Sequence, residues 1–105
     1  MTTQIQQIQQ ISKASASLPR VGNTPLLLIK SLSSKDVRIW AKAEWEQPGG
    51  SVKARAAHAI ISKAIRSGKL NSRNSLLDAS SGNTAIAYAT LLKPLGWKPT
   101  ICLPA

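Results

Sequence analysis

Residues 48–53, Pro48-Gly49-Gly50-Ser51-Val52-Lys53, lie between a strand-like segment and a helical one, and this junction decides the fold. The segment before it, Val37 to Trp45, alternates apolar and polar side chains, which predicts a strand. The segment after it, Val52 to Ser67, has helical periodicity and stops at Gly68, with Ser51 as the expected N-cap. The chain is therefore predicted to turn here from a strand into a helix.

Lys53 falls in the first turn of this predicted helix. Ala57, Ile60 and Ala64 follow it at helical spacing and share its face, which is the apolar one. Burial would disfavour a charged ammonium there, and the positive end of the helix dipole would repel it. Both effects favour a neutral, nucleophilic amine of the kind that Schiff-base chemistry needs. The alternative is that Lys53 extends from the helix end into water.

A second strand, turn and helix follow about 30 residues later, which is the spacing of βαβ units with a parallel sheet. Ser75 to Ala79 is predicted as a mostly buried strand, and Thr84 to Leu92 as a buried helix that ends near Pro94. Thr100 to Leu103 then begins a third strand. The turn between the first two elements is Ser80-Ser81-Gly82-Asn83.

Both glycine turns, residues 48–53 and 80–84, are expected beyond the carboxyl ends of parallel strands, where such sheets bind ligands. The backbone N–H groups of Gly82, Asn83 and Thr84 would then face a bound carboxylate or phosphate. The alternative is that both turns are ordinary strand-to-helix connections, which often contain Gly and Ser. Two such turns at one edge, one of them with Lys53, favour a ligand site.

The N-terminal residues 1–17 are rich in Gln and Ser, with Ile5, Ile8 and Ile11 spaced by three. They form either a short helix docked along one narrow edge or a frayed tail, and the small apolar area favours the tail. Residues 21–26 then predict a turn that leads into a short strand beginning at Leu26.

Fourteen Lys and Arg against four acidic residues give a formal charge of +10. The basic residues are scattered singly and follow no nucleic-acid motif, so an anionic small ligand, or an acidic remainder of a longer chain, explains the charge better than nucleic acid does. One Cys and one His exclude an intrachain disulfide and the usual protein-only zinc site. With neither a signal sequence nor a membrane-length apolar run, we expect a cytoplasmic protein that binds neither membranes nor nucleic acid.

Three motifs in this order resemble those of cysteine synthase (O-acetylserine sulfhydrylase), a pyridoxal-phosphate family that shares its fold with the tryptophan synthase β chain. The resemblance extends over about residues 18–105, at close to the family's spacing. The motifs are Gly22-Asn23-Thr24-Pro25-Leu26, then Lys42-Ala43-Glu44 leading to Pro48-Gly49-Gly50-Ser51-Val52-Lys53-Ala54-Arg55, and then Ser80-Ser81-Gly82-Asn83-Thr84.

The resemblance implies a cofactor, a reaction and a site. Lys53 would bind the aldehyde of pyridoxal 5'-phosphate, and Asn83 would hydrogen-bond the ring hydroxyl oxygen of the cofactor. The substrate's α-carboxylate would be enclosed by the loop that comprises Ser80, Ser81, Gly82, Asn83 and Thr84. The reaction would replace the acetate of O-acetylserine by sulfide to give cysteine, with Lys53 as general base, no metal, and usually a homodimer.

The implied fold is α/β, a three-layer parallel sheet with βαβ units of the tryptophan synthase β type, but incomplete. Residues 1–34 would form an N-terminal segment and residues 35–105 an incomplete small cofactor domain. The family's chains are considerably longer, and their phosphate-binding loop lies further along. We therefore expect an N-terminal fragment or truncated product with little or no activity.

The sequence also departs from the family pattern, and alternatives stay open. Ala54 stands where the family usually has Asp, while Ser80 and Ala85 stand where it usually has Thr and Gly. A cystathionine β-synthase has a similar lysine loop, whereas threonine synthase and the dehydratases usually have Phe in place of Val52. From another class, a non-catalytic remnant or binding module is the alternative.

Overall fold

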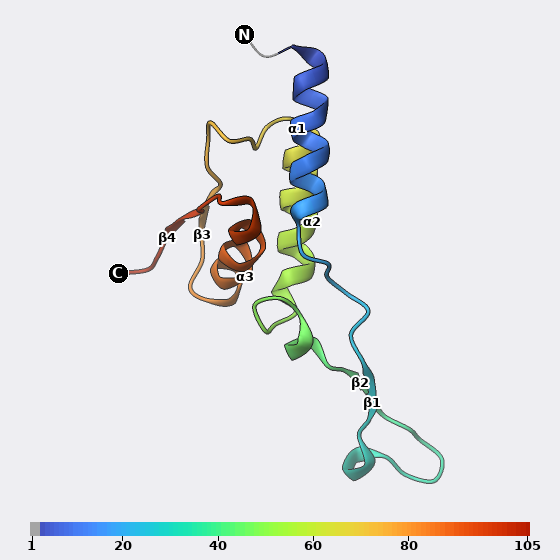
Figure 1. The fold of residues 1–105 in the computed structure, drawn as a ribbon. Helices are drawn as coiled ribbons and strands as arrows, with labels where there is room; N and C mark the ends of the chain where they lie inside the picture. The colour runs from blue at the N-terminus through green and yellow to red at the C-terminus, as the bar shows by residue number, and fades with distance from the viewer. Residues whose placement is uncertain (1–2) are drawn as a thin grey trace.

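Two helices, α2 and α3, pack side by side at the centre of the chain (Figure 1). The structure, a computed structural model, describes residues 3–105. The elements in chain order are α1 (Gln4–Ser17), β1 (Leu26–Leu28), η1 (Lys30–Leu32), β2 (Trp40–Lys42), η2 (Glu44–Glu46), α2 (Lys53–Arg66), β3 (Leu77–Ala79), α3 (Asn83–Leu92), η3 (Lys93–Leu95) and β4 (Thr100–Cys102). The predicted bounds of both central helices are thus close to those observed.

The strands form two separate pairs. β3 and β4 are parallel, with Asp78 opposite Ile101, as a βαβ unit requires. β2 instead pairs antiparallel with β1, with Leu27 opposite Ala41, so the prediction of parallel pairing holds only for β3 and β4. The predicted strand Val37 to Trp45 is also too long, because the chain coils into the 3-10 helix η2 directly after Ala43.

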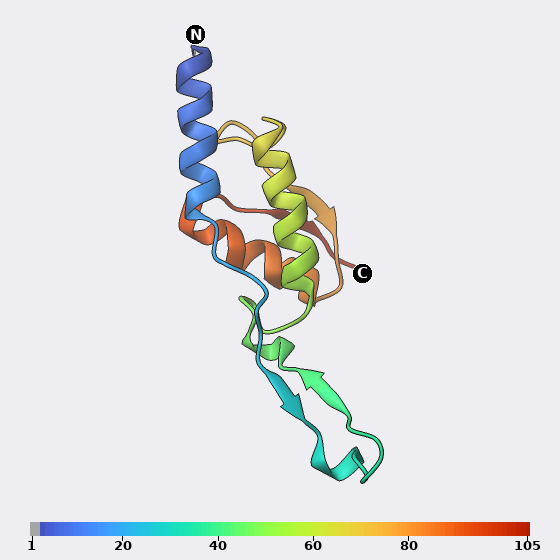
Figure 2. The same ribbon diagram turned by 90° about the vertical axis from the view of Figure 1, so that its right-hand side faces the viewer.

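The β1–β2 pair projects away from the helices as an arm of residues 26–42 (Figure 2). It contributes to a longest dimension of 66 Å. Large apolar side chains are exposed along it, namely Leu26, Leu27, Leu32, Val37, Ile39 and Trp40. A two-stranded hairpin is at best marginally stable by itself, so this arm gains little stability from the contacts made within residues 3–105.

The hydrophobic core lies between α2 and α3. From α2 it takes Ala57, Ile61 and Ile65, and Ala54 of the same helix is also buried. The members contributed by the rest of the chain are Leu18, Leu70, Ala87, Tyr88, Leu91 and Leu92. Ile60, predicted on the buried stripe, is 50% exposed, whereas Ile61 is 0% exposed. Ala57 and Ala64 of the predicted stripe do lie at the core. The buried face is nevertheless displaced from Ile60 to Ile61, because the position of α3 decides which face of α2 is covered.

The helix α1, Gln4–Ser17, is docked, so the prediction of a frayed tail is wrong. Residues 1 and 2 lie outside the described part. A reciprocal capping box begins α1. The backbone N–H of Gln6 donates to Thr3 Oγ1 at 3.2 Å, and the backbone N–H of Thr3 donates to Gln6 Oε1 at 2.9 Å. Ile11 and Ala14 then pack against the core. The capping and these contacts offset the ordering entropy that the apolar area alone could not.

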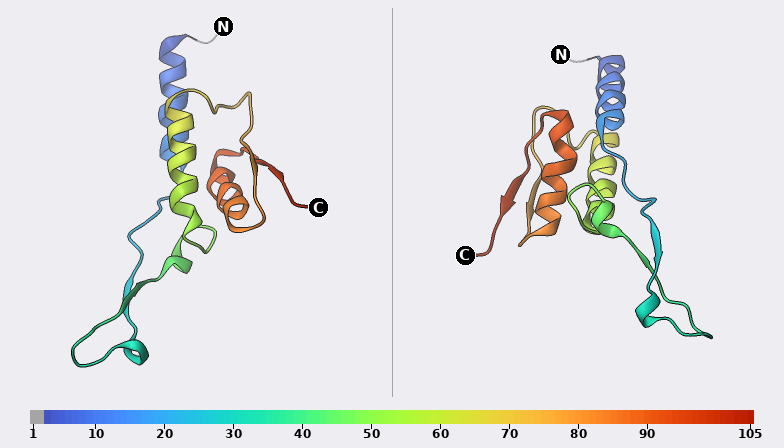
Figure 3. Two further views of the ribbon diagram at one scale, coloured as in Figure 1. Left: turned by 180° about the vertical axis from the view of Figure 1, so that it is seen from behind. Right: turned by 60° about the horizontal axis from the view of Figure 1, so that its bottom comes forward.

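The parallel pair lies on the side of α3 away from α2 (Figure 3). Tyr88, 1% exposed, connects the two layers by donating its hydroxyl to Asp78 Oδ2 at 3.0 Å. Burial, and secondarily this hydrogen bond, raises the pKa of Tyr88 to about 12. All of β3 is nevertheless exposed, with Leu77 at 67%. The prediction of a mostly buried strand is wrong because, within residues 3–105, its outer face is uncovered.

The prediction for α3 is half right. Its end before Pro94 is as predicted, with η3 continuing the chain from Lys93. Only one face of the helix is buried, however, and Ile86 is half exposed. An apolar helix needs cover on every side, and within residues 3–105 α2 and the β3–β4 pair cover α3 only in part.

Candidate active site

The two glycine turns lie against each other at one end of the helix pair. A Cβ at Gly49 would lie 3.4 Å from the Ala87 Cα and 3.5 Å from the Ile86 Cγ2, so the first turn packs on the first part of α3. Gly49 also has a φ of +84°, which disfavours a side chain. Figures 2 and 3 show the starts of α2 and α3 side by side. The close packing of this glycine brings the residues that begin the two helices to one rim.

Lys53 is the first residue of α2, and it is exposed. The prediction that it is buried is wrong, because the buried face of α2 begins at Ala54; the alternative, a lysine that extends into water, is the one observed. Ser51 is not the N-cap, a position taken by Val52. Its hydroxyl instead accepts the Lys53 N–H at 3.3 Å. The amine thus lies at the positive end of the helix and is open to a ligand.

The second turn is held by Ser80. Its Oγ accepts the N–H of Gly82 at 3.2 Å and that of Ala85 at 3.1 Å, so it caps α3 from two residues before the Gly82 N-cap. The expectation that the Gly82 N–H faces a ligand is therefore wrong in this structure. The N–H groups of Asn83 and Thr84 have no hydrogen-bond partner within residues 3–105.

The other predicted side chains of this turn are accessible. Ser81 and Asn83 are exposed, and Thr84 is half-buried. The structure therefore brings Lys53 and the Ser81–Thr84 turn to the same rim, with two backbone donors available for an anion, and assigns Ser80 to supporting the turn.

A polar cluster beside this rim was missed by the sequence reasoning. Glu44 lies at its centre: Oε1 accepts from Thr24 Oγ1 at 2.8 Å and from Arg55 Nη2 at 2.7 Å. Oε2 accepts from Arg55 Nε at 3.0 Å and from Gln47 Nε2 at 2.9 Å. Lys42 Nζ also donates to the Thr24 carbonyl. The available signal was opposite charge on Glu44 and Arg55, one on each side of the lysine loop.

These contacts control the protonation of Glu44. Hydrogen bonds from Arg55 first, then from Gln47 and Thr24, lower its pKa from 4.5 to about 2. The unfolded chain therefore binds a proton more readily than the folded chain does. The stability contributed by the carboxylate is fully present above about pH 4.5 and is lost as the pH falls toward 2.

In Glu44→Gln, the free energy of unfolding is therefore expected to fall less steeply as the pH is lowered into the acid range. Urea midpoints measured between pH 2 and pH 6 should fall less steeply with acidity in this variant than in the parent chain, because its side chain does not titrate. Glu46→Gln removes the same charge from the same 3-10 helix, without a place in the cluster, and should keep the parental slope. Equal slopes for the parent chain and Glu44→Gln would contradict the assignment.

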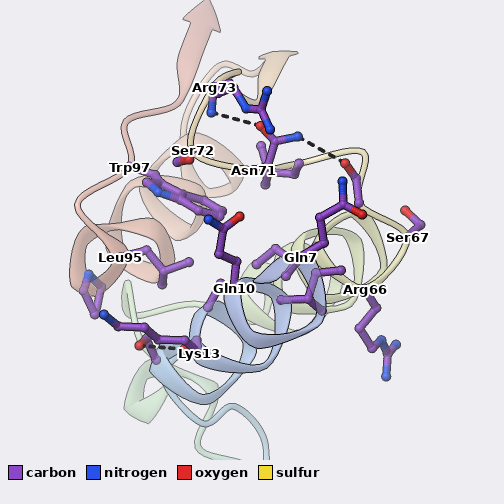
Figure 4. A pocket seen from close by; sticks show the side chains of 17 residues that line it. Gln7, Gln10, Lys13, Arg66, Ser67, Asn71, Ser72, Arg73, Leu95 and Trp97 are labelled. Atoms are coloured by element: carbon purple, nitrogen blue, oxygen red, sulfur yellow. Dashed lines mark hydrogen bonds between the residues drawn. The ribbon is translucent and has the colours of Figure 1, made fainter. Parts of the chain in front are cut away.

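A separate hollow of about 680 Å³ lies at the other end of α2, between α1, the 67–73 loop and Trp97 (Figure 4). Gln10 and the Trp97 ring face its interior, and Asn71 is held there by accepting the Arg73 N–H at 2.9 Å. No residue of the predicted site lines it. The hollow is therefore distinct from the rim at Lys53.

Between residues 3 and 105, no three His, Cys, Asp or Glu side chains gather where they could hold a metal ion. None of the helices there combines the length and apolar character needed to cross a bilayer.

The fold is that of an α/β chain in which α2 and α3 begin side by side (Figure 2), with Lys53 first in α2 and the Ser80–Asn83 turn at the start of α3. The two turns do not follow strands of one sheet as predicted, because β2 pairs only with β1. The sequence model of the family "Pyridoxal-phosphate dependent enzyme" matches residues 18–105, and the chain belongs to this family. Pyridoxal phosphate is the family's cofactor.

Proteins of similar sequence support this family membership. A cysteine synthase from Aquifex aeolicus is 41% identical over 92 residues, which cover 84% of this chain and 28% of the relative. An O-acetylserine dependent cystathionine beta-synthase from Bacillus subtilis is 38% identical over 85 residues, covering 80% and 28%. The chain thus spans less than a third of the length of these relatives.

A solved structure shows the same fold. The crystal structure of a hydrogen sulfide-producing enzyme from Fusobacterium nucleatum superposes with a TM-score of 0.73 at 31% identity. The superposition covers 87% of this chain and 29% of that one. The arrangement of helices and strands described above is therefore that of the tryptophan synthase β-like fold, in part.

The residues at the rim fit the cofactor. The amine of Lys53 is exposed at the start of a helix, and within residues 3–105 it has no hydrogen-bond partner. Asn83 is also exposed, at the start of the neighbouring helix. An aldehyde and a ring oxygen could therefore be reached from the same rim without displacing an existing contact.

Proposed function

We propose that this chain supplies the lysine and the carboxylate-binding turn of a cysteine synthase, which replaces the acetate of O-acetylserine by sulfide. The observation that carries the proposal is the packing of Gly49 on Ile86 and Ala87, since it brings the starts of α2 and α3 together. The motif resemblance over residues 18–105 and the cysteine synthase relatives support the choice of reaction.

Each residue at the rim has a role in this proposal. Lys53 holds pyridoxal phosphate through its amine, and Asn83 hydrogen-bonds the ring oxygen. The N–H groups of Asn83 and Thr84, with the Ser81 hydroxyl, bind the substrate carboxylate, while Ser80 and Gly82 keep the turn in shape. When bound, the cofactor supplies an electron sink for the substrate.

Proton movement is assigned to Lys53. Its free amine takes the proton from the substrate Cα as the Cβ–O bond breaks and acetate leaves with the electron pair. Sulfide then forms the Cβ–S bond, and Lys53 returns the proton to Cα. Overall, acetate and cysteine are formed from O-acetylserine and sulfide, without oxidation or reduction.

The finer features of the fold belong to the same proposal. Residues 35–105 would be part of a small cofactor domain in which β3 and β4 join a three-layer parallel sheet, and residues 1–34 its N-terminal segment. A homodimer, as the resemblance implies, and a cytoplasmic location belong to the same proposal. The exposed face of β3 and the exposed side chains of the arm support this, since both need further cover.

Residues 1–105 alone are expected to bind the cofactor weakly and to show little or no turnover. The reason is that the resemblance places the phosphate-binding loop outside them. The check is an assay of the purified chain for cysteine formation from O-acetylserine and sulfide. Sulfide-dependent cysteine formation by residues 1–105 would contradict this expectation.

The reaction itself is tested in a hybrid enzyme. Residues 18–105 of this protein replace the matching segment of the Aquifex aeolicus cysteine synthase, and the formation of cysteine and of cystathionine is measured separately. Cysteine as the product supports the proposal. A folded hybrid that retains the cofactor but forms neither product supports a non-catalytic remnant instead.

A second candidate is a cystathionine β-synthase, favoured by the 38% identity to the Bacillus subtilis relative. Preferential formation of cystathionine by the hybrid would select it. A nucleic-acid role would instead appear as tight, steeply salt-dependent binding that is unaffected by Lys53→Ala.

A further inference from the structure

Both ends of the loop that bears Lys53 are attached to one carboxylate. Gln47, just before Pro48, donates Nε2 to Glu44 Oε2 at 2.9 Å. Arg55, two residues after Lys53, donates Nε to the same oxygen at 3.0 Å and Nη2 to Oε1 at 2.7 Å. Glu44 therefore closes the loop of residues 48–54 from both sides.

The carboxylate is in turn fixed to the N-terminal turn. Thr24, which is 5% exposed, donates its hydroxyl to Glu44 Oε1 at 2.8 Å. Gln47, also 5% exposed, accepts the Gly22 N–H at 2.9 Å. Gly22 has a φ of +88°, and a Cβ there would lie 3.2 Å from Arg55 Nη1. The attachment is thus buried at Thr24 and Gln47, while the side chain of Arg55 is 41% exposed.

The contacts within the loop are short-range. The Gly50 N–H donates to the Gln47 carbonyl at 2.8 Å, and the Lys53 N–H reaches Ser51 Oγ at 3.3 Å. The N–H groups of Ala54 and Arg55 donate to the Ser51 and Val52 carbonyls at 3.4 and 3.1 Å, and Gly49 packs on α3. Fixing the backbone of a glycine-rich loop costs conformational entropy, and none of these hydrogen bonds joins one end of the loop to the other. Charge-assisted bidentate bonds from an arginine are stronger and more directional than neutral ones.

We propose that Glu44 is a positioning residue that holds Lys53 in place by clamping the two ends of its loop. The functional part of this inference rests on the proposed role of Lys53, whereas the clamp itself does not. Glu44 touches neither substrate nor cofactor in this account; it acts through Gln47 and Arg55.

The clamp is tested by hydrogen exchange on the full 105-residue chain. In Glu44→Gln, an amide NH₂ faces the donors of Arg55 or Gln47, so one attachment is lost. Amides of Gly50, Ala54 and Arg55 should then exchange on the order of tenfold faster, while those in the middle of α2 change less than about twofold. Glu46→Gln, the matched control, should leave both sets unchanged.

A purely structural role for Glu44 would produce a different pattern. Uniformly faster exchange along α2 and the loop, or the same effect in Glu46→Gln, would overturn the proposal. Unchanged exchange in the loop of Glu44→Gln would overturn it as well. If Glu44→Gln fails to fold, Thr24→Val, which removes one hydroxyl donor to Glu44, is measured by the same criteria.

The consequence for the amine is measured separately in the hybrid enzyme. Cofactor is trapped on lysine with borohydride, and the rate of labelling at Lys53 is compared with that at Lys63 on the same helix. Glu44→Gln should lower this ratio by about tenfold, and Glu46→Gln should leave it unchanged. The two proposals can be told apart. Faster loop exchange in Glu44→Gln would support the clamp, and a parent hybrid that is not labelled preferentially at Lys53 would contradict the proposed function.

Discussion

Ile61→Ala is expected to lower the free energy of unfolding by about 2–5 kcal/mol. Ile61 is 0% exposed and lies where α2 packs on α3, together with Ala57 and Ile65. Removal of its side chain leaves a cavity that rigid helices can fill only in part. For a domain of this size, the loss is a large fraction of the total stability. Urea unfolding followed by circular dichroism measures it.

The neighbouring Ile60 provides the matched control. Its side chain is 50% exposed, so Ile60→Ala should cost less than about 1 kcal/mol. The pair also separates the two descriptions of α2, because the sequence pattern placed Ile60 on the buried face. A larger loss for Ile60→Ala than for Ile61→Ala would contradict the packing described here.

Lys53→Ala in the hybrid enzyme is expected to lower turnover by about 10²–10⁴-fold or more. The substitution removes both the covalent attachment of the cofactor and the base that moves the substrate proton. Initial rates of cysteine formation at saturating cofactor measure the effect.

Lys63→Ala is the control for this second prediction. Lys63 is exposed in the last part of the same helix, away from the rim. The same charge is lost, so a general electrostatic effect would appear in both variants. Comparable rates for Lys53→Ala and the parent hybrid would remove Lys53 from the mechanism.

Features set by local signals could be predicted from the sequence. Gly68 and Pro94 mark the ends of α2 and α3 close to where the structure has them. The Ser80–Asn83 turn and the strand at Thr100 were likewise recognised from their own residues. The motifs identified the family, which the family match to residues 18–105 confirms.

Features set by distant contacts could not be predicted in this way. The phase of the buried face of α2 depends on where α3 lies, and a shift of one residue places Lys53 in solvent. The docking of α1 depends on Ile11 and Ala14 meeting a core formed much later in the chain. Pattern alone also does not show that β2 pairs with β1 rather than with a parallel neighbour.

The polar cluster shows the same limit at the candidate site. Thr24, Glu44 and Arg55 each belong to a quoted motif, yet Thr24 and Arg55 are 31 positions apart. The helical spacing of residues 52–67 indicates no partner for Arg55. Only the fold shows that its guanidinium turns back to the carboxylate that closes the lysine loop.

The central claim, that Lys53 is the amine presented to the cofactor, is tested most directly by locating the attached group. The hybrid enzyme is incubated with pyridoxal phosphate, reduced with borohydride, digested and examined by mass spectrometry. We predict that the pyridoxyl group is found predominantly on Lys53 and that Lys53→Ala loses it. A label absent from Lys53, or shared evenly with lysines such as Lys63, would contradict the account.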